Sequence, residues 1–256
     1  MAATGRHAQI TSAAAWAVQD WLTLVLVVGL SLTPPFLYTL WLRAKERHDR
    51  NPLRVVTGAF FYGGTVGVAV AILLHMVFEV GFAAPNANFG LEKNFVSVVI
   101  AAPIVEEIAK GLGFWFVRPH IRELEDGLVY GAAIGLGFAA TENLLYGVDA
   151  LNTVGLDLAL WTIVLRILSS MLLHLGSSAI LGFGFARVAL GNGFGLLLIP
   201  YYLVAAALHA TYNFLVTLPG VGLWALGTAL VMVVFVVSVL QRRIEVLDSL
   251  PHEQHS

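Results

Sequence analysis

Polar side chains that could do chemistry interrupt four long apolar stretches of this chain. Ionised groups inside a stretch long enough to cross a bilayer are costly, so their default interpretation is functional. The chain has no cysteine, which leaves carboxylates and imidazoles for nucleophilic or metal chemistry. The candidates are Glu106, Glu107 and Lys110 in the first stretch, Glu142 and Asn143 in the second, Arg166 and His174 in the third, and His209 and Asn213 in the fourth.

Two of the acids are adjacent and share one helical side with a lysine. Lys110 lies four residues after Glu106 and three after Glu107, so it can pair with one of them but not with both. The second carboxylate needs another cationic partner, such as a metal or a histidine, or must hold a proton. Pro103, one turn earlier, removes a backbone hydrogen bond and leaves a carbonyl free near the acids. Arg166 is expected to be a structural counter-charge.

These residue types suit the activation of water. A glutamate can take a proton from water as general base, and a histidine or asparagine can hydrogen-bond a developing oxyanion. His209 and Asn213, four residues apart, share one helix face. Alternatively, Glu142, His174 and His209 could hold a Zn²⁺ ion with one position open for water. The H-E-x-x-H pattern of many zinc proteases is absent, so the sequence permits a metal without requiring one.

The elements that carry these residues are expected to be membrane helices. Hydrophobic residues make up 58% of the chain and charged residues only 12%, a composition typical of a polytopic membrane protein. No basic block suggests nucleic-acid binding. The sequence therefore predicts an all-α bundle of about seven transmembrane helices in the lipid bilayer. The predicted runs are Trp21–Leu42, Val55–Val80, Phe95–Val117, Gly127–Gly147, Leu158–Ala186, Leu196–Val216 and Val221–Leu240.

Basic residues predict the orientation of this bundle. In the seven-span model ten lysines and arginines fall on one side, which the positive-inside rule makes cytoplasmic. Only Arg6 and Lys93 fall on the other side, so the N-terminus is expected outside and the C-terminus inside. The polar groups then lie in the middle or outer half of the bilayer. The ten residues are Arg43, Lys45, Arg47, Arg50, Arg54, Arg118, Arg122, Arg187, Arg242 and Arg243.

The fourth run places a glycine at every fourth position, at Gly127, Gly131 and Gly135. Such a stripe lets a neighbouring helix approach closely, whether or not it has a further role. No soluble domain or repeat is evident. We expect residues 1–256 to form one integral membrane domain, with a catalytic core at about 95–216 and a short cytoplasmic tail at 245–256.

Several of these motifs, in their order along the chain, resemble the PrsW family of bacterial intramembrane proteases, relatives of the CAAX prenyl protease and bacteriocin-processing group. The resemblance covers about Pro103 to Asn213. Two positions depart from the wider group, since its F-x-x-x-H histidine is Glu142 here and its E-E-x-x-x-R is E-E-x-x-K. The motifs are Pro103-Ile-Val-Glu106-Glu107-Ile-Ala-Lys110, Asp126-Gly-Leu-Val-Tyr-Gly, Phe138-Ala-Ala-Thr-Glu142-Asn143, His174 and His209-Ala-Thr-Tyr-Asn213.

The resemblance implies an intramembrane endopeptidase of the bacterial plasma membrane. It would cut a membrane-anchored protein, similar to a single-span anti-sigma factor, on the extracytoplasmic side. Glu106 or Glu107 would activate water, and His209 with Asn213 would match the motif with the oxyanion role. The family is commonly grouped with metallopeptidases. The catalytic candidates are Glu106, Glu107, Glu142, His174, His209 and Asn213.

Two other classes of protein fit the same residues. Buried acids and histidines also mark the relays of proton- or ion-coupled transporters, although no inverted repeat is evident here. A non-catalytic membrane scaffold would need the glycine stripe but not the acids. The order of the motifs favours the protease.

Overall fold

The computed structural model describes residues 3–46, 50–82, 95–191 and 195–218, with separate positions between 226 and 246; side chains are described from residue 21 onward, those of residues 80–82 excepted. Every regular element within these ranges is helical, which confirms the predicted all-α class. The predicted run Val221–Leu240 and the predicted tail lie largely outside the described residues. Within the described residues, five helical segments are long and apolar enough to cross a membrane: Trp21–Lys45, Leu53–Glu79, Leu124–Val154, Leu156–Leu190 and Gly195–Thr217.

These five segments correspond to the first, second, fourth, fifth and sixth predicted runs. The fifth, an unusually long run, is not one continuous helix. It consists of α8 (Leu156–Leu168) and α9 (Ser170–Leu190), which meet at Ser169, where φ is −125° and ψ is −73°. Those angles lie outside the helical region. The break places Arg166 at the end of one helix and His174 at the start of the next.

The third predicted run is helical but divided. It begins as a π-helical segment, η2 (Val96–Ala101), continues as α5 (Ala102–Leu112) and ends in the short α6 (Phe114–Val117) and the 3₁₀ turn η3 (Arg118–His120). Pro103 stands at the junction of η2 and α5, where it cannot donate a backbone hydrogen bond. The two glutamates therefore lie in the first turns of a short helix.

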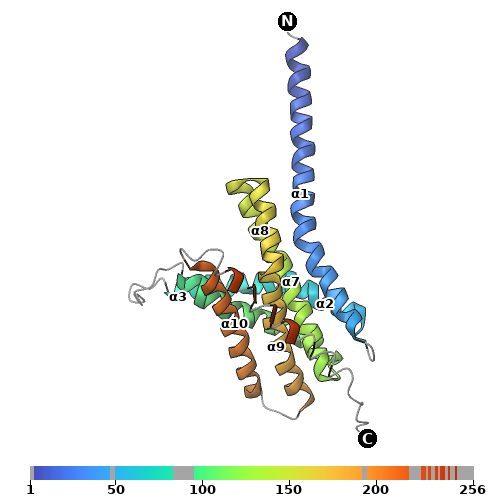
Figure 1. Ribbon diagram of the computed structural model, residues 1–256, viewed down its shortest axis with the longest axis vertical. Helices are drawn as coiled ribbons and strands as arrows, with labels where there is room; N and C mark the ends of the chain where they lie inside the picture. The colour runs from blue at the N-terminus through green and yellow to red at the C-terminus, as the bar shows by residue number, and fades with distance from the viewer. Residues whose placement is uncertain are drawn as a thin grey trace.

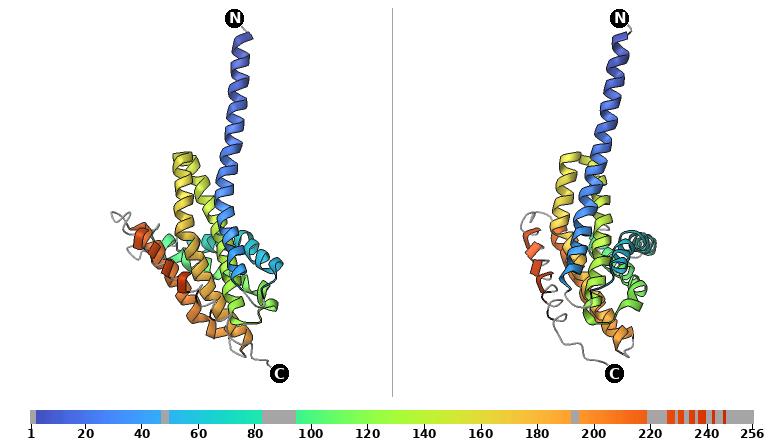
Figure 2. Two further views of the ribbon diagram at one scale, coloured as in Figure 1. Left: turned by 45° about the vertical axis from the view of Figure 1, so that its right-hand side comes forward. Right: turned by 90° about the vertical axis from the view of Figure 1, so that its right-hand side faces the viewer.

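The longest buried helix is α7 (Leu124–Val154), and the others pack around it (Figures 1 and 2). In its most apolar window 78% of the residues are buried, against 22% in the first span, which identifies α7 as the centre of the bundle. It contacts α9 along much of its length and also α8 and α1 (Ala3–Lys45). Its polar residues Glu125, Asp126 and Asn143 are buried among the other helices.

The predicted glycine stripe forms the contact between α7 and α9. A Cβ added to Gly127 would lie 2.3 Å from the carbonyl oxygen of Gly182, and one added to Gly135 would lie 2.1 Å from that of His174. No side chain fits at such separations, so the backbones touch as small-residue stripes allow. This contact fixes His174 against the helix that carries Glu142.

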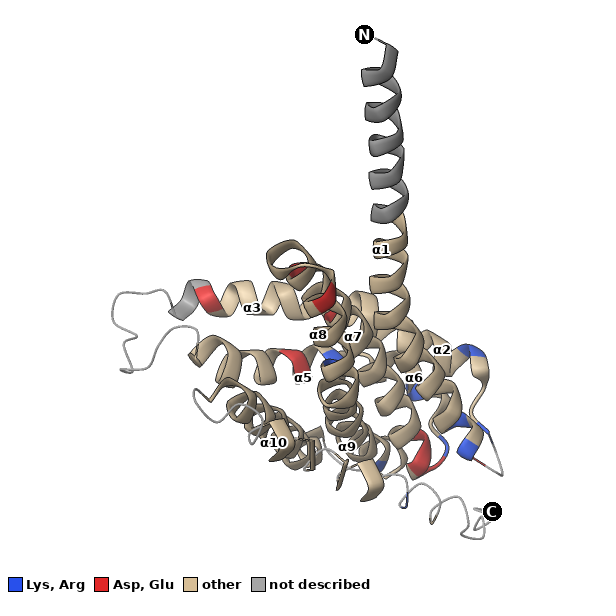
Figure 3. Ribbon diagram, turned by 45° about the horizontal axis from the view of Figure 1, so that its top comes forward, with Lys and Arg blue, Asp and Glu red and all other residues tan. Residues whose placement is uncertain are grey.

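A second close crossing involves α2 (Leu53–Tyr62), the π-helical η1 (Gly63–Gly67) and α3 (Val68–Phe82). These elements run across the direction of α1 (Figure 1). A Cβ on Gly137 would lie 1.8 Å from the carbonyl oxygen of Phe60, and Thr141 Oγ1 donates to the carbonyl of Gly64 at 2.7 Å. Beyond this crossing α3 runs beside α5, with α10 (Ile199–Thr217) below them (Figure 3). The 3₁₀ turn η4 (Gly195–Leu198) precedes α10.

Where α1 ends, two buried carboxylates share one amide. Asn51 Nδ2 donates to Glu46 Oε1 at 2.6 Å and to Asp126 Oδ1 at 2.9 Å, which ties the end of α1 to the start of α7. Burial raises the pKa of the Glu46 carboxyl to about 7, against the opposing effect of its hydrogen bonds from Asn51. Lysines and arginines gather around this end of the molecule, away from the far end of α3 (Figure 3).

Candidate active site

The predicted polar residues converge on a cavity of about 550 Å³ at the centre of the bundle. Helices α3, α5, α7, α8, α9 and α10 all contribute to its wall. Five of the six predicted catalytic residues line it: Glu106, Glu142, His174, His209 and Asn213. The sixth, Glu107, lines a separate cavity of about 520 Å³ further along α5. Consecutive glutamates on one helix therefore face different surroundings.

Glu107 is fully buried and accepts three hydrogen bonds on one oxygen. Lys110 Nζ donates to Oε1 at 2.6 Å, Ser177 Oγ at 3.0 Å and His209 Nδ1 at 3.0 Å. Charge-assisted bonds of this kind hold a carboxylate ionised and fixed. The sequence allowed Lys110 to pair with either acid, and the structure selects Glu107, three residues away.

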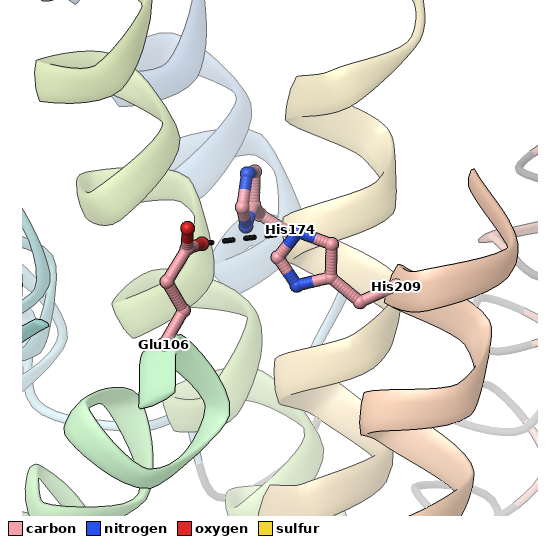
Figure 4. A group of neighbouring side chains, drawn as sticks. All are labelled: Glu106, His174 and His209. Atoms are coloured by element: carbon pink, nitrogen blue, oxygen red, sulfur yellow. Dashed lines mark ion pairs between the residues drawn. The ribbon is translucent and has the colours of Figure 1, made fainter. Parts of the chain in front are cut away.

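The bond from Glu107 determines how His209 is protonated. A carboxylate can only accept, so Nδ1 of His209 carries the hydrogen and Nε2 of the neutral ring keeps its lone pair. That Nε2 lies 3.8 Å from Glu106 Oε2, and the two side chains face each other with His174 beside them (Figure 4). Glu106 Oε2 is buried and accepts no hydrogen bond from any described residue. Together these atoms offer an unused lone pair and an unpartnered carboxylate oxygen.

Both ring nitrogens of His174 are engaged. Lys110 Nζ lies 3.0 Å from Nδ1, and because an ammonium has no lone pair it must donate. The hydrogen of the ring is then on Nε2, which donates to Glu142 Oε2 at 2.7 Å. The His174 ring centroid is 4.9 Å from that of His209, edge to face.

Glu142 lies between His174 and Arg166. Its Oε2 also accepts from Arg166 Nη2 at 2.7 Å, which confirms the expected counter-charge role of that arginine. Arg166 Nε donates to Asn143 Oδ1 at 3.0 Å, and the guanidinium stacks on Tyr146 with its carbon 3.9 Å from the ring centroid. Glu142, at the position of the F-x-x-x-H histidine, is thus paired with Arg166.

Asn213 supports the start of the glutamate helix. In η2 the amide of Ala102 donates to the carbonyl of Ser97, five residues back. The next donor in that register would be Pro103, which has no N–H to give to Val98. Asn213 Nδ2 donates to the carbonyl of Val98 instead, at 2.9 Å. One N–H of the amide caps the carbonyl that the proline frees, and the other is left for the cavity.

A metal would find nitrogen and oxygen donors here. Glu106, His174 and His209 each offer one ligand atom, and these three atoms lie within 4.8 Å of one another. Two nitrogens and one carboxylate oxygen suit Zn²⁺ with a position left for water. The unpartnered Oε2 of Glu106 and the lone pair on His209 fit that use, whereas His174 must first release one of its two hydrogen bonds.

The sequence predicted Glu142 as the carboxylate ligand, and the structure brings Glu106 into the group with the histidines. Glu142 Oε2 is instead engaged by Arg166 and by His174. Sequence reasoning also overlooked Ser177, which donates to Glu107, and Tyr212, whose hydroxyl bonds Ser169 at 2.8 Å. Their spacing gave a signal, because both lie three residues after a site histidine and so share its face.

Comparison with known proteins points to the same family as the sequence motifs. The model of the PrsW family, described as intramembrane metalloproteases, matches residues 51–240. Protease PrsW of Bacillus subtilis (strain 168) is 26% identical over 200 residues, 75% of this chain and 83% of that protein. Protease PrsW of Geobacillus kaustophilus (strain HTA426) is 26% identical over 197 residues, 74% and 79%.

A third relative, Protease PrsW of Clostridioides difficile (strain 630), is 29% identical over 120 residues, 46% of this chain and 48% of that protein. No solved structure matches the chain. The resemblance drawn from the motifs and the predicted class of enzyme are therefore confirmed. Since the family model spans most of its length, this chain belongs to the PrsW family of intramembrane metalloproteases.

Proposed function

We propose that this enzyme cuts single-span, membrane-anchored proteins, similar to anti-sigma factors, and that Glu106 activates the attacking water. The observation that carries the proposal is the contact between Glu106 and His209 in the central cavity. Glu106 has a buried oxygen without a partner, and the lone pair of His209 Nε2 points at it from 3.8 Å. A water placed between them would meet a proton acceptor on both sides.

Glu107 then has a supporting role. Its oxygen Oε1 is saturated by Lys110, Ser177 and His209. Its oxygen Oε2 has no partner among the described residues, as in Glu106, but Glu107 lines the separate cavity and not the central one, so it is poorly placed to take a proton from a water there. It orients the imidazole of His209 instead, as carboxylates do behind metal-bound or catalytic histidines. This division of labour is the one that we propose for the two adjacent glutamates, whose roles the sequence leaves open.

Glu106, His174 and His209 are the residues that would hold Zn²⁺, each through one atom, and the second carboxylate oxygen of Glu106 would then be the one that takes the proton of water. When bound there, the ion would supply Lewis-acid polarisation of water or of the scissile carbonyl. The chain's own groups provide the remaining functions. Glu106 takes the proton of water and later returns it to the leaving amine, and Asn213 offers its second N–H to the developing oxyanion.

In the orientation that we propose, the position of the cavity supports extracytoplasmic cleavage. Its wall includes Met76, Ser97 and Thr217, which lie at the ends of α3, η2 and α10 opposite the basic loops. With the predicted seven spans and cytoplasmic basic loops, the substrate would enter from outside the cell or laterally from the bilayer. We accordingly place the enzyme in the bacterial plasma membrane as one integral domain with its core at about 95–216.

The proposal is tested by sequencing new N-termini in membranes of the native host. The chromosomal gene is deleted, and the strain is complemented with wild type, Glu106→Gln or Glu79→Gln. Glu79 lies outside the central cluster, bonded to Ser97 at 3.2 Å, and serves as the matched control. Cleavages within or next to single spans should appear with wild type and Glu79→Gln and be absent with Glu106→Gln. Identical sets of N-termini in all strains would refute the proposal.

A further inference from the structure

The described donors in and beside the cavity differ in how far their hydrogen bonds are committed. Lys110 is fully buried, gives two of its N–H groups to Glu107 and His174, and does not line the cavity. Tyr212 lines the cavity, but its hydroxyl hydrogen is committed. Ser169 gives its own hydrogen to the carbonyl of Leu165 at 2.7 Å, so Tyr212 must be the donor in the bond to Ser169.

Arg166 differs from both. Its Nε donates to Asn143, and its Nη2 donates to Glu142 and to Ser170 at 3.0 Å. Nη1 has no acceptor within the part of the chain that the structure describes, although the residue lines the cavity and its side chain is 17% exposed. The N–H groups on Nη1 are therefore available to a molecule in the cavity.

The anchoring of Arg166 exceeds what charge balance requires. A counter-charge for Glu142 needs one contact, yet the guanidinium plane is also fixed by Asn143, by Ser170 and by stacking on Tyr146. Fixing the plane fixes the direction of Nη1. Donors that are held in place before the reaction are the ones that stabilise a developing charge effectively.

The guanidinium is also close to the reacting groups. Arg166 Nη2 and His174 Nε2 share the same oxygen of Glu142, each at 2.7 Å. His174 in turn lies edge to face with His209, which faces Glu106. Arg166 therefore stands on the opposite side of His174 from Lys110, at the wall of the cavity that Glu106 faces.

We propose that Arg166 is a catalytic residue whose Nη1 donates to the oxyanion of the tetrahedral intermediate. This rests on the proposed function. Water loses a proton to Glu106 while its oxygen bonds the scissile carbonyl carbon, and the carbonyl π pair moves onto the oxygen. That anion receives the hydrogen bonds of Arg166 and Asn213. When the pair returns, the C–N bond breaks and Glu106 gives its proton to the amine.

The test uses Arg166→Lys in full-length protein, with Arg187→Lys as matched control. Lysine keeps the charge beside Glu142 but loses the planar fork. Arg187 bonds Tyr201 at 2.9 Å, outside the central cavity. The assay measures kcat and KM on a peptide spanning a cleavage site mapped in host membranes, and the affinity of the same peptide with a phosphonate in place of the scissile amide.

Arg166→Lys should lower kcat by roughly 10²–10³-fold, the cost of removing one oxyanion donor, with KM unchanged. Phosphonate affinity should fall by a similar factor, because that anion resembles the intermediate. A purely structural counter-charge predicts wild-type kcat and wild-type phosphonate affinity, and that result would overturn the proposal. If wild type cuts nothing, the proposed function itself has failed.

A second variant covers the case in which Arg166→Lys does not fold. Tyr146→Leu removes the stacking partner but leaves the ion pair with Glu142 intact. It should reduce kcat and phosphonate affinity together while the thermal unfolding temperature stays near that of the wild type. Equal kcat and affinity in folded Tyr146→Leu and wild type would contradict the role of a fixed guanidinium.

Discussion

Glu107 Oε1 and His209 Nδ1 lie 3.0 Å apart across the interface between α5 and α10. This one contact is the basis of the different roles proposed for the two adjacent glutamates. It holds Glu107 against the imidazole of His209, and it turns the lone pair of that imidazole toward Glu106. The proposed catalytic role of Glu106 depends on the support that Glu107 gives to its neighbours.

Glu107→Gln should therefore destabilise the protein more than Glu106→Gln. Removing the charge leaves Lys110, which is fully buried, without its carboxylate partner. Breaking such a pair costs about 3–5 kcal/mol of unfolding free energy. Thermal unfolding of both variants in the same detergent measures the difference. Equal unfolding temperatures would mean that Lys110 finds compensation elsewhere.

Metal analysis separates the two possible carboxylate ligands. Detergent-purified wild type should contain bound zinc, and both Glu106→Gln and His209→Ala should lose it, because these residues supply ligand atoms. Glu142→Gln should retain the metal, since that carboxylate is engaged by Arg166. The opposite pattern, with metal lost in Glu142→Gln and kept in Glu106→Gln, would restore the ligand set expected from the sequence.

The cap that Asn213 provides to Val98 predicts an energetic coupling with Pro103. Asn213→Ala leaves the carbonyl freed by the proline without a partner, at a cost of about 1–3 kcal/mol. In the Pro103→Ala background a backbone N–H becomes available to that carbonyl, so the same substitution should cost less. A double-mutant cycle of unfolding free energies measures the difference. Additive effects would show that the two residues act independently.

Sequence reasoning reached the class of fold because a bilayer penalises every exposed polar group. That penalty turns Glu106, Glu142, His174 and His209 to one interior, whatever the exact packing. The same penalty does not decide whether Lys110 pairs with the acid three residues away or with the one four residues away. The sequence therefore did not determine whether its partner is Glu106 or Glu107. The choice depends on which neighbours each side of α5 faces. The rotation of α5 about its axis sets those neighbours, and that rotation depends on the π-helical turn before Pro103.

Two further features could not be predicted from a single sequence. The break at Ser169 follows no proline or glycine, so nothing in the composition marked it. The group that could hold a metal contains Glu106 where the sequence suggested Glu142. Arg166, on a different helix, reaches Glu142 in a long-range contact that a single sequence does not reveal. The glycine stripe on α7 was predicted correctly, since it needs only the spacing of four residues.

The Glu46 carboxyl should make the protein less stable as the pH rises. Its pKa is raised from 4.5 to about 7 in the folded protein. The stability linked to its protonated form is therefore complete below about pH 4.5 and is lost as the pH passes through 7. The raised pKa corresponds to about 3 kcal/mol. Glu46→Gln should flatten the decline in unfolding temperature between pH 5 and pH 8, and an unchanged decline would assign it to another group.

The most direct test of the central claim is peptide cleavage by purified enzyme reconstituted in lipid vesicles with one mapped single-span substrate. Wild type should cut the substrate at the site found in host membranes. Glu106→Gln should be inactive although, once metal has been removed from both proteins, it keeps the wild-type unfolding temperature, because its neighbour Glu107 still holds Lys110 and His209. Cleavage by Glu106→Gln at the wild-type rate would contradict the account, since the water-activating group would then lie elsewhere.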